Sequence, residues 1–114
     1  MSVIKYQEMN LSDVSMEGVK GTLKANVISK QEGWSEYTLR VFRIQSGGFT
    51  PRHQHDWEHV NYVIKGQGRM RIGDELFDLE EKDFAFVPPG TEHQFENPYN
   101  DDFEFICIVP NRGA

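Results

Sequence analysis

The sequence is 114 residues long, which suffices for one domain with its own core but leaves no room for a second. Its composition, 38% hydrophobic and 26% charged, is typical of a globular chain rather than a disordered one. The formal net charge of −6 and the lack of a basic run disfavour binding to nucleic acid or to an anionic membrane.

The only cysteine excludes an internal disulfide, so the chain needs no oxidising compartment. The first ten residues lack the apolar core of a signal peptide, and no apolar run approaches the ~18 residues of a membrane span. We therefore expect a cytoplasmic protein, with residues 1–114 forming a single domain.

The segments that follow the N-terminus have the pattern of β-strands. Residues 19–27 (VKGTLKANV) alternate apolar and polar positions with a period of two, which predicts a strand. Residues 35–45 are rich in β-branched and aromatic residues, and we expect this strand to stop at Gly47-Gly48. Further strands are predicted over residues 60–66, 68–72, 75–79, 84–87 and 103–109, separated by turn residues at 73–74, 82–83, 88–90 and 97–98. Short strands at this spacing indicate an all-β sandwich or barrel.

Three of the four histidines lie in one stretch, RHQHDWEH, at residues 52–59. His53 and His55 are two residues apart, so their side chains point to the same side of an extended strand. His59 opens the next predicted strand, and His93 opens another strand 34 residues later. Ligands that come from several strands in this way are typical of a metal site inside a barrel.

A pH-sensing cluster is the alternative interpretation, because imidazoles titrate near neutrality. Four close imidazoles would however repel one another once protonated, and a bound cation is the simpler way to hold them together. A closed structural zinc site is disfavoured, since such sites usually recruit cysteine. Imidazole suits Mn, Fe, Co, Ni, Cu and Zn alike, so the ligand set alone selects no metal.

Two motifs in this region resemble those of the cupin superfamily. Residues 47–66 are similar to the first motif, and residues 86–97 are similar to the second. The matching positions are Gly47, His53, His55, His59 and Gly66 in the first motif, and Pro88, Gly90, His93 and Asn97 in the second. The resemblance implies a double-stranded β-helix, the jelly-roll barrel of cupins, over about residues 35–110, with an N-terminal strand arm over about residues 1–30 and the metal inside the mouth.

The sequence departs from the usual cupin pattern at two positions. Lys82 stands where the second motif usually opens with glycine, and His59 stands where most cupins have glutamate. The second departure resembles the small single-domain cupins that bind a divalent transition metal with four histidines. Four neutral imidazoles leave a divalent site at +2 rather than +1, which makes the ion a stronger Lewis acid. We expect one such metal per chain, with manganese or iron favoured and zinc, nickel, cobalt or copper as alternatives.

The wall of the expected pocket can be read in part. Alternation along residues 103–109 places Phe105 and Cys107 inside the barrel and Glu104 in solvent. Plainer interpretations stay open, because buried aromatic residues are usually core, a single cysteine usually packs as a small hydrophobe and a strand arginine is often solvated. The candidate wall residues are Trp57, Phe95, Phe105, Cys107 and Arg40, the last as a cation for an anionic substrate.

The function that these features favour is a metal-dependent oxidoreductase of the dioxygenase type, acting on a small organic molecule. Many cupins are dioxygenases, so this expectation follows from the resemblance. A non-redox isomerase or lyase and a non-catalytic ligand-binding module stay open, because no acid–base pair is apparent beside the metal ligands. We also expect a homodimer, in which the N-terminal segment up to about Val27 adds a strand across the interface.

Overall fold

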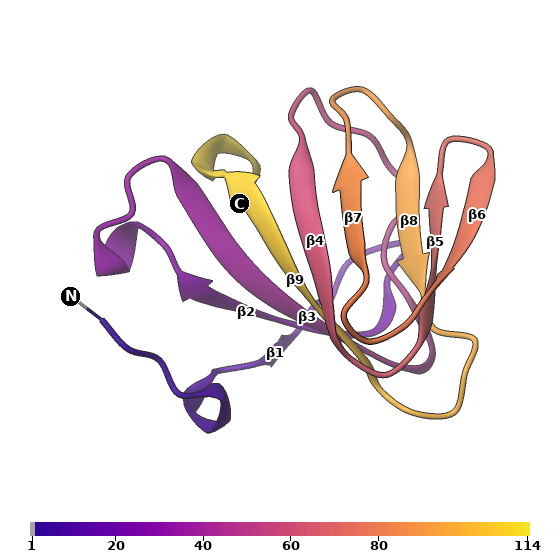
Figure 1. The fold of residues 1–114 in the computed structure, drawn as a ribbon, viewed down its shortest axis with the longest axis horizontal. Coiled ribbons are helices and arrows are strands. Elements are labelled where there is room, and N and C mark those ends of the chain that lie inside the picture. Colours follow the sequence, from indigo (N-terminus) through magenta and orange to yellow (C-terminus); the bar gives the residue numbers. More distant parts are fainter. Residues whose placement is uncertain (1) are drawn as a thin grey trace.

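Strands dominate residues 2–114, the part of the chain that this computed structural model describes (Figure 1). They are β1 (Ser12–Asp13), β2 (Lys20–Ile28), β3 (Tyr37–Phe49), β4 (His59–Lys65), β5 (Gly68–Ile72), β6 (Glu75–Leu79), β7 (Phe84–Val87), β8 (His93–Glu96) and β9 (Phe103–Pro110). Three short 3-10 helices complete the described elements: η1 (Tyr6–Glu8), η2 (Lys30–Glu32) and η3 (Asn111–Gly113). No helix within residues 2–114 has the length and apolar character needed to cross a membrane.

The strands form one antiparallel sheet that curls on itself, in the order β6-β5-β8-β3-β9-β4-β7. The N-terminal strands extend it, because β2 pairs with β3 and β1 pairs with β2. The long strand β3 belongs to both halves of the curl (Figure 1), since it pairs with β9 along most of its length and with β8 at Phe49 and Glu96. The all-β prediction is confirmed.

The prediction that the strand over residues 35–45 stops at Gly47-Gly48 is wrong, because this strand, β3, continues to Phe49. Gly47 has a φ of +80°, a conformation that favours glycine. A Cβ on Gly48 would lie 2.6 Å from the carbonyl oxygen of Lys20, so only glycine fits there. The two glycines therefore let one strand pass from one half of the curled sheet to the other rather than ending it.

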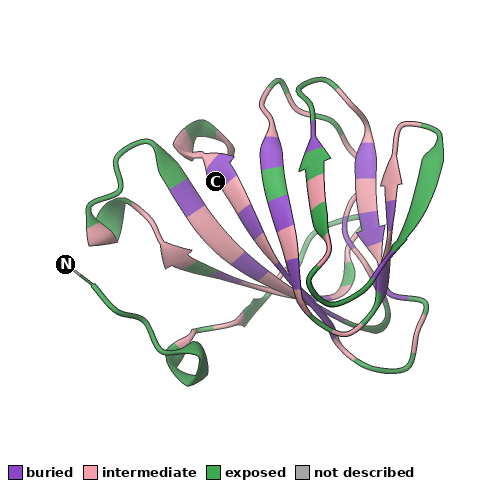
Figure 2. Cartoon of the chain, in the orientation of Figure 1, coloured by how far each residue is buried: buried purple, intermediate pink, exposed green. Residues whose placement is uncertain are grey.

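The core lies inside the curl and follows the predicted alternation. Buried and partly exposed residues alternate along β4 and β5, as Figure 2 shows. On β9 the side chains of Phe103, Phe105, Cys107 and Val109 are buried, as predicted. Each fully buried large apolar side chain stabilises the fold by roughly 1.5–3 kcal/mol.

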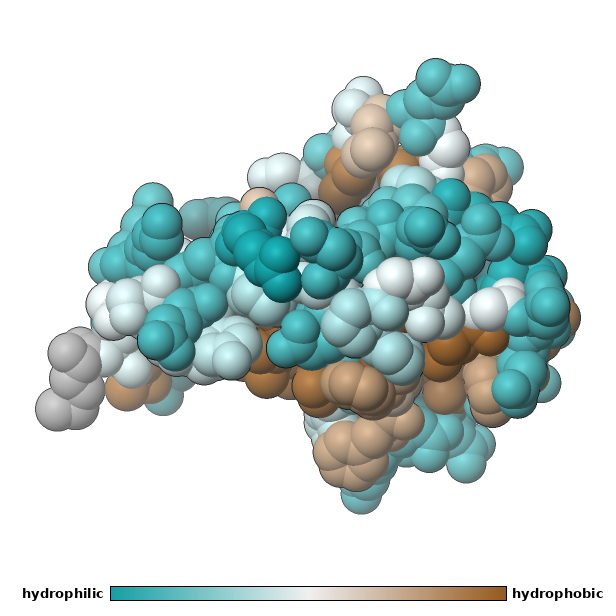
Figure 3. Space-filling view, turned by 90° about the horizontal axis from the view of Figure 1, so that it is seen from above, coloured by the Kyte–Doolittle hydropathy of each residue, from teal (hydrophilic) through white to brown (hydrophobic). Residues whose placement is uncertain are grey.

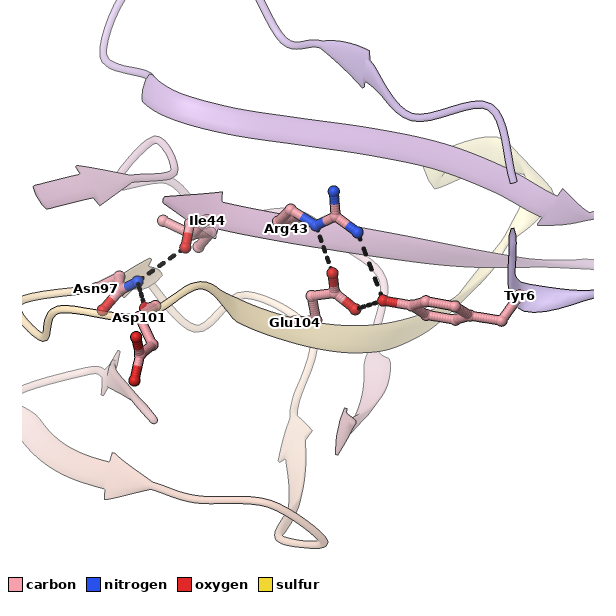
Figure 4. A network of polar contacts seen from close by, with 6 residues as sticks. All are labelled: Tyr6, Arg43, Ile44, Asn97, Asp101 and Glu104. Atoms are coloured by element: carbon pink, nitrogen blue, oxygen red, sulfur yellow. Dashed lines mark hydrogen bonds and ion pairs between the residues drawn. The ribbon is translucent and has the colours of Figure 1, made fainter. Parts of the chain in front are cut away.

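The prediction that Glu104 faces solvent is wrong, because its side chain is completely buried. It lies on the outer face of β9, where it pairs with Arg43 and accepts a hydrogen bond from the hydroxyl of Tyr6 (Figure 4). This hydrogen bond is the main reason that the pKa of Tyr6 is raised above its usual value. Alternation assigned Glu104 to the correct face of the sheet, but the N-terminal segment that brings Tyr6 to that face covers it.

Asn97, the last residue of the second motif, ties the segment that follows β8 to strand β3. Its side-chain amide donates to the carbonyl oxygens of Ile44, at 2.8 Å, and of Asp101, at 2.7 Å (Figure 4). Its Oδ1 accepts from the backbone N–H of Tyr99. Asn97 therefore has a structural role.

Lys82, which stands where the motif usually has glycine, is the one non-glycine residue with a positive φ among residues 2–114. Its φ of 75° lies in the left-handed region, where a side chain costs free energy. The backbone at this turn therefore has the conformation that glycine would adopt more easily.

Apolar side chains are exposed on the outer face formed by β4 and β7. Phe84 and Phe86 are 76% and 55% exposed, and Val60, which pairs with Phe86, is 44% exposed. Brown surfaces gather along one side of the molecule in Figure 3. β2 pairs with β3 of its own chain rather than extending away from it, and the homodimer stays a prediction.

Candidate metal centre

Backbone hydrogen bonds bring the two histidine-bearing segments together. His53 and His93 form a β-bridge, in which each backbone N–H donates to the other residue's carbonyl oxygen, at 3.1 and 2.9 Å. The backbone N–H of Gly90 donates to the carbonyl oxygen of His55. His59 and His93 are the first residues of β4 and β8, so both side chains start from fixed strand ends.

The four imidazoles converge at this point. His53, His55 and His93 each offer a ligand atom within 4.8 Å of the others, so these three histidines could hold a metal ion. The Nε2 atom of His59 lies 3.2 Å from the Nε2 atom of His93. The structure therefore brings His59, at the start of β4, into the same cluster as His93, at the start of β8, and as His53 and His55, which lie between β3 and β4.

Hydrogen bonds at the far side of two rings define where their protons are. His93 Nδ1 lies 2.9 Å from the carbonyl oxygen of Thr91, which can only accept, so Nδ1 carries the proton. The side-chain amide of Asn61 donates to the carbonyl oxygen of Ile106, which leaves Asn61 Oδ1 to accept from His59 Nδ1 at 2.9 Å. In the neutral state each ring therefore turns an unprotonated Nε2 toward the other, and metal ligands are commonly oriented in this way.

The surroundings also keep these rings neutral near pH 7. Burial, followed by the charges of neighbouring histidines and of Arg40, lowers the pKa of His53 to about 4. Burial is likewise the main cause that lowers the pKa of His59 to about 4, and it lowers the pKa of His55 and His93 as well. Deprotonated imidazole is the form that binds metal.

Two unprotonated Nε2 atoms 3.2 Å apart repel each other unless a cation lies between them. Nitrogens bound to one ion at about 2.0–2.1 Å, with angles near 90–110°, lie roughly 3 Å apart. The spacing of His59 and His93 thus fits two ligands of one metal ion. A shared proton is the alternative cation, but the lowered pKa values disfavour it at neutral pH.

The histidines line a cavity of about 180 Å³. Four of the predicted wall residues, Arg40, Phe95, Phe105 and Cys107, also line it. Trp57 lies outside this lining and stacks on the ring of His55, with centroids 4.4 Å apart and an interplanar angle of 4°. Trp57 therefore supports a histidine from behind rather than facing the cavity.

Sequence reasoning missed the contribution of β2. Its polar face turns Thr22 and Lys24 into the cavity, where they join Thr50 and Phe42. Alternation along residues 19–27 separated a polar face from an apolar one, but it did not show that the polar face looks into the barrel. Among the described residues that line the cavity there is no Asp or Glu.

A broader hollow of about 840 Å³ lies elsewhere, formed by residues 65–67, 80–82 and 100–102. It contains charged turn residues but no histidine. The histidine cavity is therefore the better candidate for a metal-dependent site.

Several known proteins are similar to this chain in sequence or in structure. The oxalate-binding protein of Thermotoga maritima is 25% identical over 111 residues, covering 94% of this chain and 92% of that protein. An acireductone dioxygenase of Synechococcus sp. is 30% identical over 98 residues, covering 76% of this chain and 48% of the enzyme. This chain spans about half the length of several curated relatives that it matches.

The polyketide cyclase RemF of Streptomyces resistomycificus has a similar structure, with a TM-score of 0.90 and 25% identity, covering 96% of this chain and 79% of that one. The family model described as Cupin domain matches residues 40–109, which include both histidine motifs and strands β4 to β8. The predicted cupin barrel is thus confirmed, and the chain belongs to the cupin family.

Proposed function

We propose that His53, His55, His59 and His93 hold one divalent transition metal. The observation that carries this proposal is the pair of Nε2 atoms, 3.2 Å apart, whose rings are both fixed by hydrogen bonds at Nδ1. Nothing in this arrangement distinguishes the first-row metals, because imidazole binds them all. Manganese or iron is proposed first, since both support reactions with dioxygen.

The reaction proposed is an oxidation of the dioxygenase type, acting on a small organic molecule in the histidine cavity. The similarity to acireductone dioxygenases supports this reaction class. A bound metal would supply Lewis-acid polarisation or electron transfer, and the chain's own residues would hold the substrate beside it and exclude water. A cavity of about 180 Å³ is smaller than the ~300–1,000 Å³ typical of sites for drug-sized ligands, which favours a substrate of few heavy atoms.

A second candidate is a non-redox reaction in which the metal polarises a carbonyl group. It is favoured by the lining of the cavity, which offers four neutral ligands and no carboxylate among the described residues. A divalent ion there would keep its full +2 charge, and this charge strengthens polarisation. The structural similarity to a polyketide cyclase supports the same class.

Metal content tests the ligand set directly. Untagged protein should contain about one transition-metal ion per chain by mass spectrometry, and His59→Ala should lose most of it. Glu58→Ala is a matched control, because Glu58 is adjacent in sequence but does not line the cavity. Unchanged metal uptake by His59→Ala would contradict the proposal.

Oxygen dependence separates the two reaction classes. Protein loaded with iron or manganese should consume dioxygen when it is supplied with small carbonyl or enediol compounds. Turnover of the same compounds under argon would instead support the non-redox reaction. Tight binding of a ligand without turnover in either atmosphere would indicate that the protein is a non-catalytic ligand-binding module.

A further inference from the structure

Arg40 has an unusual environment for a partly buried cation. It lies on β3 opposite Cys107 of β9, and its Nη2 donates to the Cys107 thiol at 3.2 Å. Its guanidinium carbon lies 5.0 Å from the ring centroid of Phe42. A thiol is a weak acceptor and a ring face accepts no strong hydrogen bond, so neither contact satisfies the charge.

The Nε–H of Arg40 is buried and has no hydrogen-bond partner among the protein groups. No carboxylate within residues 2–114 forms an ion pair with this side chain, whereas at least one does so with each of Arg43, Arg52, Arg69 and Arg112. A buried, unpaired donor on a charged group costs free energy, and native proteins rarely leave one. An anion in the cavity would give the Nε–H of Arg40 the partner that the described residues do not supply.

Lys24 adds a second cation to the same cavity. It lies on β2 opposite Phe42, and its side chain lines the cavity together with Arg40. Burial, followed by the charge of Arg40, lowers the pKa of Lys24, so the two cations are close enough to disfavour each other. An anion between them would relieve this repulsion.

The charge of the cavity contrasts with that of the whole chain. The chain carries 18 acidic residues and a net charge of −6, yet the described residues that line the cavity include two cations and no acid. Arg40 lines the same cavity as His53, His55, His59 and His93. An anion bound by Arg40 would thus lie beside the proposed metal site.

We propose that Arg40 and Lys24 form an anion-binding site in the wall of the histidine cavity, which takes the carboxylate of a small organic substrate. The guanidinium of Arg40 donates to the carboxylate, Lys24 supplies a second positive charge, and Phe42 and Phe105 pack against the apolar part. This inference rests on the proposed function for its substrate, but the binding of the anion itself does not require the metal.

Calorimetric titration of metal-free protein with benzoate and with acetate tests the anion site. Benzoate combines a carboxylate with a ring that suits the aromatic wall, and benzamide is its neutral counterpart. We expect benzoate to bind at least tenfold more tightly than benzamide, because a hydrogen bond between two charged groups is stronger than one to a neutral amide. Equal affinities for benzoate and benzamide, or no binding of either carboxylate, would overturn the proposal.

Three substitutions assign the effect to the two cations. Arg40→Met should weaken benzoate binding by about tenfold or more, and Lys24→Met by about threefold or more. Lys20→Met is the matched control, since Lys20 lies on the same strand but is exposed, and it should bind as wild type does. If Arg40→Met does not fold, Lys24→Met decides alone, and wild-type affinity in that variant overturns the proposal.

Metal content measured on the same preparations separates this inference from the metal proposal. Benzoate binding that depends on Arg40 in protein unable to take up metal would support the anion site and contradict the metal site. One metal ion per chain, together with wild-type benzoate affinity in Arg40→Met and Lys24→Met, would support the metal site and contradict the anion site.

Discussion

Asn61 offers a sharp test of how the chain orients its candidate metal ligands. This residue of β4 is 2% exposed, and its Oδ1 accepts the proton of His59 Nδ1 at 2.9 Å. Its amide also donates to the carbonyl oxygen of Ile106 at 3.3 Å. Asn61→Leu fills a similar volume but removes both hydrogen bonds, so His59 is no longer held with Nε2 unprotonated.

Two separate losses should follow from Asn61→Leu. Removing a hydrogen-bond partner of a metal-ligating histidine typically weakens metal binding by about 10–100-fold, equivalent to roughly 1.4–2.8 kcal/mol. Loss of the donor to Ile106 should also lower the free energy of unfolding of metal-free protein by about 1 kcal/mol. Only the first loss depends on the metal, so the two can be measured independently.

A titration of metal-free protein with Zn²⁺, in competition with a chromophoric chelator, measures the first loss. Chemical denaturation without metal measures the second. Asn61→Asp is the control, because it keeps an acceptor for His59 Nδ1 and should bind zinc at least as tightly as wild type does. If Asn61→Leu folds and binds zinc within about twofold of wild type, the tautomer argument for His59 is refuted.

Four further predictions concern stability and assembly. Glu104→Gln should lower the free energy of unfolding by about 2–4 kcal/mol, because it breaks the buried ion pair with Arg43, whose guanidinium keeps partial access to water. A loss below about 0.5 kcal/mol in urea denaturation would contradict this prediction. Lys82→Gly should stabilise the protein by about 1 kcal/mol, measured in the same way, because the backbone there has a positive φ. Unfolded histidines titrate near pH 6.5 whereas His53 and His59 have a pKa of about 4, so the unfolded state binds more protons between these values. The metal-free protein should therefore lose stability as the pH falls from about 6.5 to 4, and a flat profile would be evidence against the lowered pKa values. Light scattering should show a homodimer that packs through the exposed outer face of β4 and β7, and Phe84→Ser should shift it toward monomer; a wild-type monomer would refute this prediction.

Local sequence patterns predicted the strands well, because a period of two reflects the pleat of each strand and needs no knowledge of its neighbours. The predicted segments at residues 68–72, 75–79 and 84–87 match β5, β6 and β7. The error at Gly47-Gly48 has a physical cause. Glycines mark both turns and close approaches of two backbones, and only the position of Lys20 across the bend distinguishes them.

The histidine cluster was also accessible from the sequence, because its spacing follows the motifs of a known family and two of its members, His59 and His93, were expected to open strands. The ring orientations were not, since they depend on Asn61 from the same strand and on the carbonyl oxygen of Thr91. A carboxylate from another part of the chain could equally have met either ring.

The sequence by itself thus determined the all-β class, the positions of most strands along the chain and the four histidines of the candidate site. Only the tertiary structure decided what each strand face meets. Alternation fixes on which side of a strand the side chain of Glu104 or Lys24 lies. The N-terminal segment then covers the side that carries Glu104, and the curl of the sheet turns the side that carries Lys24 into the cavity. For this reason the sequence identified the four candidate metal ligands and Arg40, while the burial of Glu104 and the place of Lys24 in the cavity emerged only from contacts between segments far apart in the chain.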